Sequence, residues 1–487
     1  MGLDHSFDLK GSRFAGKIFL AFMIVILAGH FGLWYMAVAY PAHAPSPSLV
    51  AVQETLPAQT ATSTQNFSTS TPIRIIDTLT IADAVPQNGK FIAADLENMK
   101  LTLYQDGVAL TEYPILTKGR PGSPYETPAG FYSVLTKESN HLNSREVVYM
   151  PYSMQFYGNY FIHGWPYYTD GTPVASTYSG GCIRLSTANA KKVYAFAEKG
   201  TGVFVYDPIR ATQTASLVLD SIPAPSVSAG SYLVADVDTG DVFLEQNAEN
   251  PQQPISSVTK LMTALVANET IMFNQKIAIT RGELLHDTST TKEKFVVGDL
   301  LYPLIMESND AVADRLAQYY GTTSFIDWMN TTAKALDMQS THFADASGIS
   351  AENVSTPDDL YRLATYLANK KSFIWGITRT PTKQLVASNG NVYHFNNLNL
   401  FSSSPDFIGG KVGQTAVDQD TMASVFSIPI NGVSRRVAII VLKSNDYTTD
   451  TIKLADWVTQ SAQQGATLVG TACVSCTMPG HYRKIQL

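Results

Sequence analysis

Three regions of the chain differ in their pattern of hydrophobic and polar residues. Residues 18–39 read IFLAFMIVILAGHFGLWYMAVA, an apolar run of 22 positions. From about Phe91 the apolar runs are short and rich in strand-forming residues, as in FIAADL, KLTLYQDG and GFYSVL, with turn residues between them. Further on, the strand-like YLVADVD precedes helical patterns such as VTKLMTALVANE, and strand-like RVAIIVLK comes near the end. The pattern predicts an N-terminal apolar helix, a β-dominated domain over 89–207 and an α+β domain over 229–465.

The apolar run over residues 18–39 is long enough to cross a membrane. As a helix it would be about 33 Å long, because each residue adds about 1.5 Å along the axis. Lys10, Arg13 and Lys17 precede it, and positive residues favour the cytoplasmic side. We therefore expect a cytoplasmic tail over 1–17, a single-pass anchor in the cell membrane and an extracytoplasmic body. A cleaved signal peptide and a buried core helix are the alternatives, and both usually have a shorter apolar run.

Two segments have the composition of linkers. Residues 40–88 have no hydrophobic period at their start, where 16 of the 32 positions from residue 41 onward are Ser, Thr or Pro, and we expect an extended stalk. Residues 208–228 would separate the two domains, since the segment SIPAPSVSAG at 221–230 has the composition of a linker. The tail over 466–487 carries Cys473 and Cys476, whose spacing fits a local disulfide, a redox pair or half of a metal site. We expect no catalytic role for this pair.

Composition excludes several classes of protein. Of the 487 residues, 45% are hydrophobic and only 15% are charged, so the chain can bury real cores and is not disordered throughout. The net charge of −7 gives no basic excess to meet phosphates, which argues against a nucleic-acid partner. We predict no metal and no cofactor.

The first candidate catalytic residues lie in the β-dominated domain. The strand-like FIHG, which contains His163, is followed by SGGCIR, which starts at Ser179 and contains Cys182 and Arg184. A thiol is mostly protonated at neutral pH, so Cys182 needs a base such as His163 to become a strong nucleophile. Backbone N–H groups of the glycine pair before Cys182 could form an oxyanion hole, and Arg184 could hold a substrate carboxylate. A single Cys and a single His also occur as inert buried residues, so the pattern alone leaves both interpretations open.

These motifs resemble the signature of the YkuD-type L,D-transpeptidases. The HG and SxGCIR motifs, the upstream TPAGFY and the opening strands IAADLENMKLTLYQDG follow the order of that family over about residues 89–207. The resemblance implies a β-sandwich-like domain that cuts a peptidoglycan tetrapeptide stem after its third residue and joins the acyl group to an amine of another stem. It implies that Cys182 is the nucleophile and His163 the base. The other signature positions, with an implied substrate-binding role, are Ser179, Gly181 and Arg184. Gly180 stands where many members carry a second histidine.

The second candidate set lies where the helical patterns of the α+β domain begin. In PISSVTK, Ser257 and Lys260 are three positions apart, and residues at i and i+3 share one face of a helix. Burial and the positive end of the helix would favour a neutral Lys260, which could then deprotonate Ser257. The pattern is short, and a capping serine beside a solvated lysine is the alternative.

The surrounding sequence resembles the low-molecular-weight penicillin-binding proteins, specifically D-alanyl-D-alanine carboxypeptidases, over about residues 229–445. Three further motifs have counterparts here: ESNDA at 307–311 for S-x-N, THFADASG at 341–348 for T-H-F…G, and GKVGQT at 410–415 for K-T-G. The resemblance implies a β-lactamase-like fold, in which helices flank an antiparallel sheet. The implied site residues are Ser257 as the acylated nucleophile, Lys260 as its base, Asn309 to orient the substrate and Lys411 to bind its terminal carboxylate or tune the site.

Two departures from these motifs bear on activity in the second domain. Glu307 takes the place of the first serine of S-x-N, where a carboxylate would pair with Lys260 or Lys411 and raise the lysine pKa. Val412 replaces the threonine of K-T-G and loses one hydrogen bond to the substrate carboxylate. The second domain is therefore either a carboxypeptidase or a catalytically weak domain that binds stem peptides only.

Together the two resemblances imply a cell-wall-remodelling enzyme that acts on peptidoglycan stem peptides. A carboxypeptidase shortens a pentapeptide stem to the tetrapeptide that an L,D-transpeptidase uses, and tethering both sites raises the local concentration of that intermediate. A wall-binding module with two weakened sites and a β-lactam-responsive sensor or β-lactamase are the other classes considered. The intact cysteine signature argues against a wall-binding module. The short segment before the apolar run is too small for a cytoplasmic signalling domain, which argues against a sensor.

Overall fold

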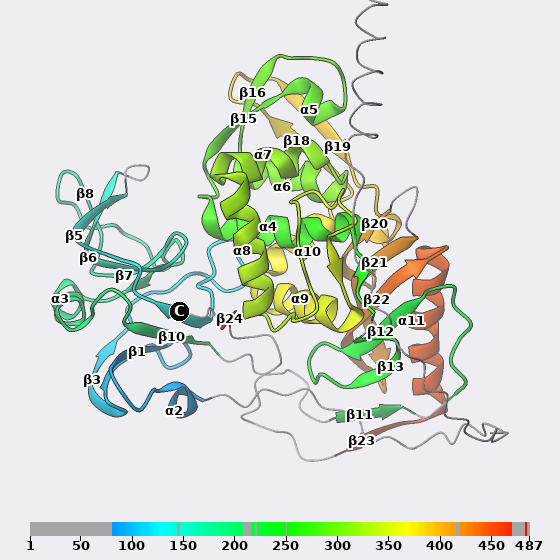
Figure 1. The fold of residues 1–487 in the computed structure, drawn as a ribbon, viewed down its shortest axis with the longest axis horizontal. Helices are drawn as coiled ribbons and strands as arrows, with labels where there is room; N and C mark the ends of the chain where they lie inside the picture. The colour runs from blue at the N-terminus through cyan, green and yellow to red at the C-terminus, as the bar shows by residue number, and fades with distance from the viewer. Residues whose placement is uncertain are drawn as a thin grey trace, which may run out of the picture. The chain divides into compact units, whose positions relative to one another are not determined.

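The computed structural model describes residues 80–143, 147–207, 216–219, 222–249, 251–414, 419–469 and 483–484 (Figure 1). The predicted cytoplasmic tail, the membrane anchor and most of the stalk lie outside these residues, as do Cys473 and Cys476. No helix within the described ranges is both long and apolar enough to span a bilayer. The described residues form a β-rich domain followed by an α+β domain, which is the two-domain architecture that the sequence predicts.

Two sheets build the β-rich domain. The first contains β1 Lys90–Asp95, β2 Lys100–Gln105, β3 Val108–Pro114, β4 Gly130–Ser133, β10 Gly202–Tyr206 and β24 Arg483–Lys484, and its strand order is β24-β4-β10-β1-β2-β3. The second contains β5 Thr136–Asn143, β6 Val148–Tyr157, β7 Tyr160–His163, β8 Tyr167–Tyr168 and β9 Ile183–Arg184; its order is β5-β6-β7-β9, and β8 pairs with β6. Two helices accompany them, α2 Ile81–Ala84 and α3 Thr187–Phe196.

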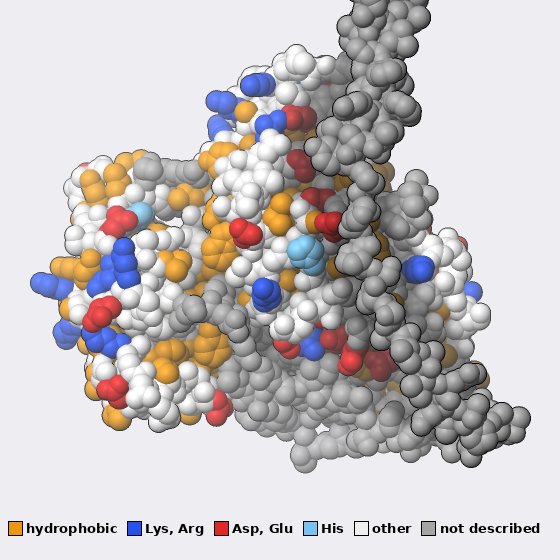
Figure 2. Space-filling view, viewed as in Figure 1, with side chains coloured by type: hydrophobic (Ala, Val, Ile, Leu, Met, Phe, Trp, Pro, Cys, Tyr) orange, Lys and Arg blue, Asp and Glu red, His pale blue; other side chains and the backbone are white. Residues whose placement is uncertain are grey.

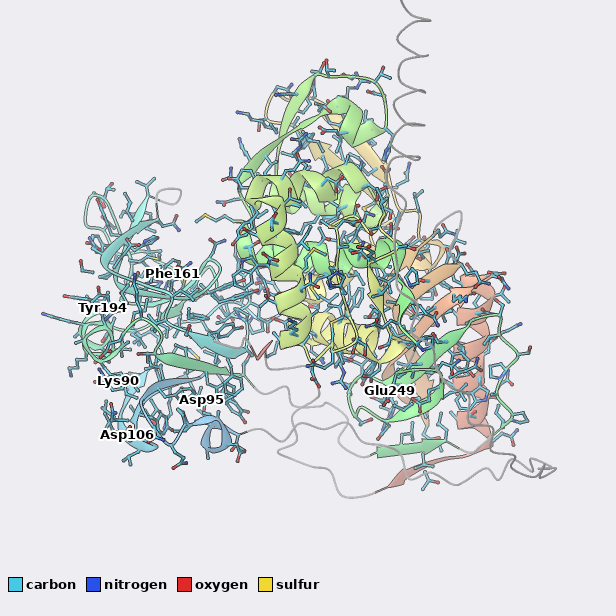
Figure 3. All side chains as sticks on the ribbon, viewed as in Figure 1. Lys90, Asp95, Asp106, Phe161, Tyr194 and Glu249 are labelled. Atoms are coloured by element: carbon cyan, nitrogen blue, oxygen red, sulfur yellow. The ribbon has the colours of Figure 1, made fainter. Side chains whose placement is uncertain are left out.

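One hydrophobic core joins the two sheets. Ile92 and Leu101 of the first sheet and Met154 and Ile162 of the second are fully buried in it. Neighbouring residues of a strand point to opposite faces, so the short alternating runs of the sequence leave polar side chains outside. Figure 3 shows Tyr194 on α3, whose ring meets that of Tyr152 on β6 at a centroid distance of 5.8 Å.

The α+β domain is organised around a five-stranded antiparallel sheet. Its strands are β12 Ser231–Asp236, β13 Val242–Gln246, β20 Phe407–Gly413, β21 Asp420–Ile430 and β22 Val433–Ser444, in the order β13-β12-β22-β21-β20. Its helices are α4 Thr259–Thr270, α5 Arg281–Leu285, α6 Val297–Met306, α7 Asp310–Tyr320, α8 Thr322–Ala335, α9 Pro357–Lys370, α10 Ser372–Thr378 and α11 Tyr447–Gln464, with 3-10 turns η1 Ser256–Val258 and η2 Leu400–Ser403. Short two-stranded pairs complete it: β14 Gln253–Pro254 with β17 Val354–Ser355, β15 Lys276–Thr280 with β16 Lys292–Val296, and β18 Thr382–Val386 with β19 Val392–Asn396.

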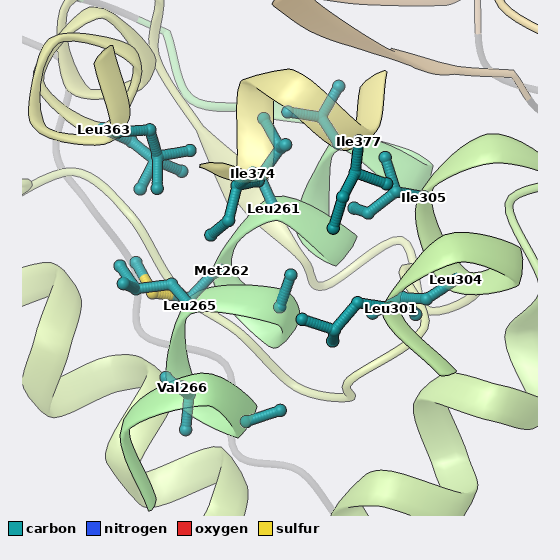
Figure 4. Close-up of a cluster of buried hydrophobic side chains, with 14 of the residues drawn as sticks. Leu261, Met262, Leu265, Val266, Leu301, Leu304, Ile305, Leu363, Ile374 and Ile377 are labelled. Atoms are coloured by element: carbon teal, nitrogen blue, oxygen red, sulfur yellow. The ribbon is translucent and has the colours of Figure 1, made fainter. Parts of the chain in front are cut away.

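Helix α4 is the central element of this domain, because every one of its residues is buried. Figure 4 shows how it is surrounded: its side chains meet those of α6, α9 and α10 in one cluster. The labelled members are Leu261, Met262, Leu265 and Val266 of α4, Leu301, Leu304 and Ile305 of α6, Leu363 of α9, and Ile374 and Ile377 of α10. Because this helix is buried on all sides, it has packing partners on all sides, and this packing fixes where the first turn of α4 lies.

The central strands of the sheet are covered on both faces. Along β22 the buried positions run almost without a break, as the apolar sequence RVAIIVL suggests. One face packs on the helices around α4, and the other packs on α11 through Leu454, Trp457 and Val458. Lys411 and Val412 on β20 therefore stand at one edge of a firmly held sheet.

Three strands lie in segments whose composition predicts a linker and a tail. In the linker, β11 Ser216–Leu219 pairs antiparallel with β23 Ala466–Val469, and in the tail β24 pairs parallel with β4. The linker segment SLVL and the tail segment ATLV are short and apolar, so each can pair as a strand despite the polar residues around it.

On the face shown in Figure 2, Lys and Arg side chains are interspersed with Asp, Glu and hydrophobic ones and do not gather into one basic patch.

Candidate active sites

The cysteine and the histidine of the first signature lie on neighbouring strands. His163 ends β7, and Cys182 comes directly before β9. The two strands pair in parallel, with roughly 4.8 Å between neighbouring strands. His163 lies opposite Arg184, two residues after Cys182. Both side chains line the same cleft, together with Arg184. Residues nearly 20 positions apart in the sequence are therefore brought together by the sheet.

The loop before Cys182 is held tightly by hydrogen bonds. The Ser179 hydroxyl donates to the Cys182 carbonyl oxygen (2.5 Å) and accepts from the Gly181 N–H (3.1 Å). The Thr127 hydroxyl donates to the Gly181 carbonyl oxygen at 2.8 Å. Gly181 has a φ of +106°, and a Cβ there would lie 2.3 Å from the Tyr160 ring, so no other residue fits without a shift. Ser179 and Gly181 thus shape the nucleophile loop, and the Gly181 N–H is already engaged rather than aimed at an oxyanion.

Gly180 has a different environment from its neighbour. It is exposed, it lines the cleft, and a Cβ built on it meets nothing within 4 Å. A side chain at this position would extend into open space, so the absence of a second histidine leaves the loop geometry intact.

His163 is held as a neutral imidazole. Its side chain is buried, and its Nδ1 lies 2.6 Å from the carbonyl oxygen of Gly164, which can only accept a hydrogen bond. Nδ1 therefore carries the proton and Nε2 keeps its lone pair. Burial, with a smaller contribution from the Arg184 charge, lowers the pKa of His163 to about 3. At neutral pH the imidazole can accept a proton from the Cys182 thiol, whose Sγ lies 3.9 Å from the carbonyl oxygen of Asn159.

Arg184 is buried rather than extended into solvent. Its guanidinium lies 5.8 Å from the Trp165 ring centroid, and one N–H reaches the Tyr178 carbonyl oxygen at 3.4 Å. These contacts hold the positive charge beside the cleft, where a carboxylate of the substrate could meet it.

The serine and lysine of the second signature are in direct contact, as the spacing predicts. Ser257 lies in η1 immediately before α4, and Lys260 lies in the first turn of α4. The Lys260 Nζ is 2.8 Å from the Ser257 hydroxyl, 2.6 Å from an Asp310 carboxylate oxygen and 2.5 Å from the Ser347 carbonyl oxygen. Gly348 comes close to this turn from another loop, since a Cβ there would lie 2.0 Å from the Ser256 carbonyl oxygen.

The two lysines of this site are buried, and burial lowers the pKa of both. For Lys260 the Asp310 carboxylate opposes that effect, but the pKa still lies below its ordinary value. For Lys411, burial and the nearby Lys260 charge lower the pKa to about 7. The Lys411 Nζ donates to the Ser308 hydroxyl at 3.0 Å and to the Val412 carbonyl oxygen at 2.7 Å. Ser257, Ser308, Asp310, Lys411 and Val412 line one cleft.

Asn309, the residue predicted to orient substrate, lies beside the second site with its side chain engaged in hydrogen bonds. Asn309 does not line the cleft: its side chain is buried, its Oδ1 caps α7 at the Val312 N–H (3.0 Å), and its Nδ2 donates to the carbonyl oxygens of Glu283 and Leu284 (both 3.1 Å). Asn309 thus caps a helix in this structure, and its role in orienting substrate stays a prediction.

Glu307 also departs from the predicted arrangement. Its carboxylate accepts a hydrogen bond from the Asn396 N–H at 3.0 Å instead of meeting Lys260 or Lys411. Ser308, with a φ of +59°, points its hydroxyl to Lys411, and Asp310 supplies the carboxylate at Lys260. Ser308 and Asp310 are therefore the residues of this segment that contact the two lysines. The left-handed backbone at Ser308 turns its hydroxyl toward Lys411.

Comparisons with known proteins match the two domains separately. The L,D-transpeptidase catalytic domain family matches residues 89–205. The D-alanyl-D-alanine carboxypeptidase family matches residues 219–445. The two predicted resemblances are confirmed.

Curated relatives match about a third of the chain. A D-alanyl-D-alanine endopeptidase of Haemophilus influenzae is 40% identical over 150 residues, which is 29% of this chain and 51% of that protein. A D-alanyl-D-alanine endopeptidase of Escherichia coli is 28% identical over 177 residues, 35% of this chain and 56% of that protein. The chain therefore spans about half the length of these relatives. A solved D-alanyl-D-alanine carboxypeptidase structure from Mycobacterium tuberculosis is 26% identical, covers 49% of this chain and 93% of its own, and superposes with a TM-score of 0.43.

Proposed function

We propose that this protein remodels peptidoglycan through two acyl-transfer sites, as an L,D-transpeptidase at Cys182 and a D-alanyl-D-alanine carboxypeptidase at Ser257. One observation carries the proposal: a neutral, buried His163 lies on the strand next to Cys182, in one cleft with Arg184. The two family matches support the same chemistry for each domain. The substrates are stem peptides, and no cofactor takes part.

At the first site the chemistry is transfer of an acyl group through a thioester. The Cys182 Sγ attacks the carbonyl carbon of the third stem residue while His163 Nε2 accepts the thiol proton. The bond to the fourth residue breaks, and that residue leaves as an amine that takes the proton from His163. An amine of a second stem then attacks the thioester, gives its proton to His163 and releases Cys182. Arg184 supplies a fixed positive charge for a carboxylate of the donor.

At the second site the same chemistry proceeds through an ester. The Ser257 Oγ attacks the carbonyl carbon of the fourth residue of a pentapeptide stem while Lys260 accepts its proton. The fifth residue leaves with that proton, and water hydrolyses the ester to a tetrapeptide stem. Lys411 binds the terminal carboxylate in its charged form. The tetrapeptide is the donor that the first site needs, so the sites work in sequence.

A second candidate function applies to the α+β domain alone, namely stem-peptide binding without turnover. The Asp310 carboxylate at 2.6 Å favours the charged ammonium of Lys260, and an ammonium cannot accept the serine proton. Val412, on the cleft wall, also lacks the threonine hydroxyl of the related motif.

Mass spectrometry of defined stem peptides tests the proposal. We expect wild type to convert pentapeptide to tetrapeptide and then to cross-linked dimer. Cys182→Ala should stop at tetrapeptide, and Ser257→Ala should leave pentapeptide intact but still cross-link added tetrapeptide. Cross-linking by Cys182→Ala would refute the first site. Conversion of pentapeptide to tetrapeptide by Ser257→Ala would refute the second site. If wild type does not carry out this conversion, stem-peptide binding would be the role of the α+β domain.

We also propose that the segment before residue 80 anchors both domains to the outer face of the cell membrane. The apolar run and the three positive residues before it support this topology. A reporter that works only outside the cytoplasm, fused after residue 72, should be active. Activity solely of a reporter that requires the cytoplasm would reverse the topology.

A further inference from the structure

The cleft around Cys182 is lined by residues of both domains. On one side are Cys182, His163 and Arg184 of the β-rich domain. On the other is a stretch from the end of α4 and the loop after it, which we call the α4 wall. The cleft-lining members of the α4 wall are Asn268, Glu269, Met272, Phe273 and Asn274. The same helix carries Lys260 near its start, so α4 reaches from one site to the other over its 12 residues.

Hydrogen bonds place the α4 wall against the β-rich domain. The Asn268 Nδ2 donates to the Pro124 carbonyl oxygen at 3.0 Å, and the Asn159 Nδ2 donates to the Thr270 carbonyl oxygen at 3.1 Å. A Cβ at Gly158 would lie 2.4 Å from the Glu269 carbonyl oxygen, so the backbones meet there with no room for a side chain. The approach is as close as in a protein interior.

Buried charges make the same contact specific. Glu269 accepts a hydrogen bond from the Tyr157 hydroxyl at 3.0 Å and pairs with Lys371 at 3.7 Å, with both charged side chains fully buried. Lys370 pairs with Asp207 of the β-rich domain at 2.6 Å. Because Lys370 and Asp207 belong to different domains, separating the domains would break this buried ion pair at a cost of about 3–5 kcal/mol, so the observed arrangement is strongly preferred.

The contact reaches the nucleophile itself in two steps. The Cys182 Sγ lies 3.9 Å from the Asn159 carbonyl oxygen, and the side chain of Asn159 is the one that binds the backbone of the α4 wall. On the outer part of the cleft, Phe273 meets the Tyr125 ring edge-on at a centroid distance of 5.9 Å. Met272 and Phe273 are half-buried and Asn274 is exposed, so these side chains remain open to a bound molecule.

From this geometry we propose that the α4 wall is part of the stem-peptide-binding surface of the Cys182 site, with Met272 and Phe273 contacting apolar side chains of the peptide and Asn274 hydrogen-bonding its backbone. The proposal rests on the function proposed for Cys182. It gives the α+β domain a role in L,D-transpeptidation that needs no reaction at Ser257. Asn274 and Met272 act by positioning the peptide, because neither donates to nor accepts from the thiol.

The double variant Met272→Ala/Asn274→Ala tests this proposal. We expect the KM for a tetrapeptide donor to rise about tenfold, with kcat changed less than about twofold, because the lost contacts bind the peptide and not the reacting atoms. Labelling of Ser257 by a fluorescent penicillin should be unchanged. Asn389→Ala is the matched control, an exposed asparagine on the β18–β19 hairpin that does not line the cleft.

A binding measurement separates this proposal from the proposed function. Bound tetrapeptide should protect Cys182 from alkylation by iodoacetamide, and mass spectrometry of the proteolytic peptide that contains Cys182 measures the alkylated fraction. The double variant should need about ten times more tetrapeptide for half protection. An unchanged KM and an unchanged protection midpoint would overturn the role of the α4 wall. Protection without any turnover by wild type would refute the proposed transpeptidation and leave the α4 wall as a binding surface.

Discussion

The two candidate sites solve the same chemical problem with different electrostatics. At Cys182 the proposed base is a buried imidazole, and burial favours its neutral form, which can accept a proton. At Ser257 the proposed base is a lysine whose neutral form is favoured by burial, while the Asp310 carboxylate favours its charged form. The protonation state of the first base is thus set by burial alone for the most part, and that of the second by two opposing effects. The comparison teaches that a complete motif is not enough to predict reactivity, since the surrounding burial and charges set the protonation state of the base.

The largest expected effect separates the two sites completely. Cys182→Ala should lower L,D-transpeptidation by about 10³-fold or more, because removing the nucleophile leaves only binding and positioning. Acylation of Ser257 by a labelled penicillin should stay at the wild-type rate. Assays of both activities on the same preparation measure this, and slower labelling of Ser257 would show that the sites are not independent.

A stability measurement tests the charge on Lys411. Its pKa of about 7 in the folded protein lies below the ordinary value near 10.5, so the unfolded chain binds more protons between those values and stability rises with pH there. Lys411→Met should therefore raise the free energy of unfolding by roughly 3 kcal/mol at pH 6, and the gain should shrink toward pH 10. Urea unfolding at both pH values measures it. A gain that is equal at pH 6 and pH 10 would contradict the lowered pKa.

A measurement of stability at acid pH tests the protonation state of His163 at the first site. The folded pKa of His163 is about 3 and the ordinary value is 6.5, so its contribution to stability is present above pH 6.5 and is lost as the pH falls toward 3. Between pH 7 and pH 5 wild type should lose about 2 kcal/mol from this group. His163→Asn should lose that much less over the same interval. Equal losses in wild type and variant would show that His163 is not held neutral.

The smallest effect sharpens the comparison at Lys260. Asp310→Asn keeps the shape of the side chain but removes the charge that favours the ammonium, so a larger fraction of Lys260 should be neutral and Ser257 should acylate about tenfold faster. Stopped-flow labelling with a fluorescent penicillin gives the rate. Glu307→Ser is the matched control and should change it little, because Glu307 binds the Asn396 N–H. A large effect of the control with none at Asp310 would restore the Glu307 assignment.

Local sequence was informative where the chemistry is local. The three-residue spacing of Ser257 and Lys260 predicts their contact, and the structure has it at 2.8 Å. The alternation of short apolar runs predicts a β-rich first domain, which the two sheets confirm. The predicted pairing of Glu307 with a lysine was wrong, because the left-handed backbone at Ser308 decides which side chains of this segment face the lysines, and composition does not encode a backbone angle.

By itself the sequence determined the two-domain architecture, both nucleophile motifs and the acidic balance of charge, because these depend on residue type and short-range spacing. Only the tertiary structure decided that His163 is neutral, that Asn309 caps a helix, and that Asp310 meets Lys260. It also decided that the end of α4 lines the Cys182 cleft. The physical reason is that burial, charge pairing and the approach of residues from different helices and strands depend on how the elements pack, and no short pattern contains that information.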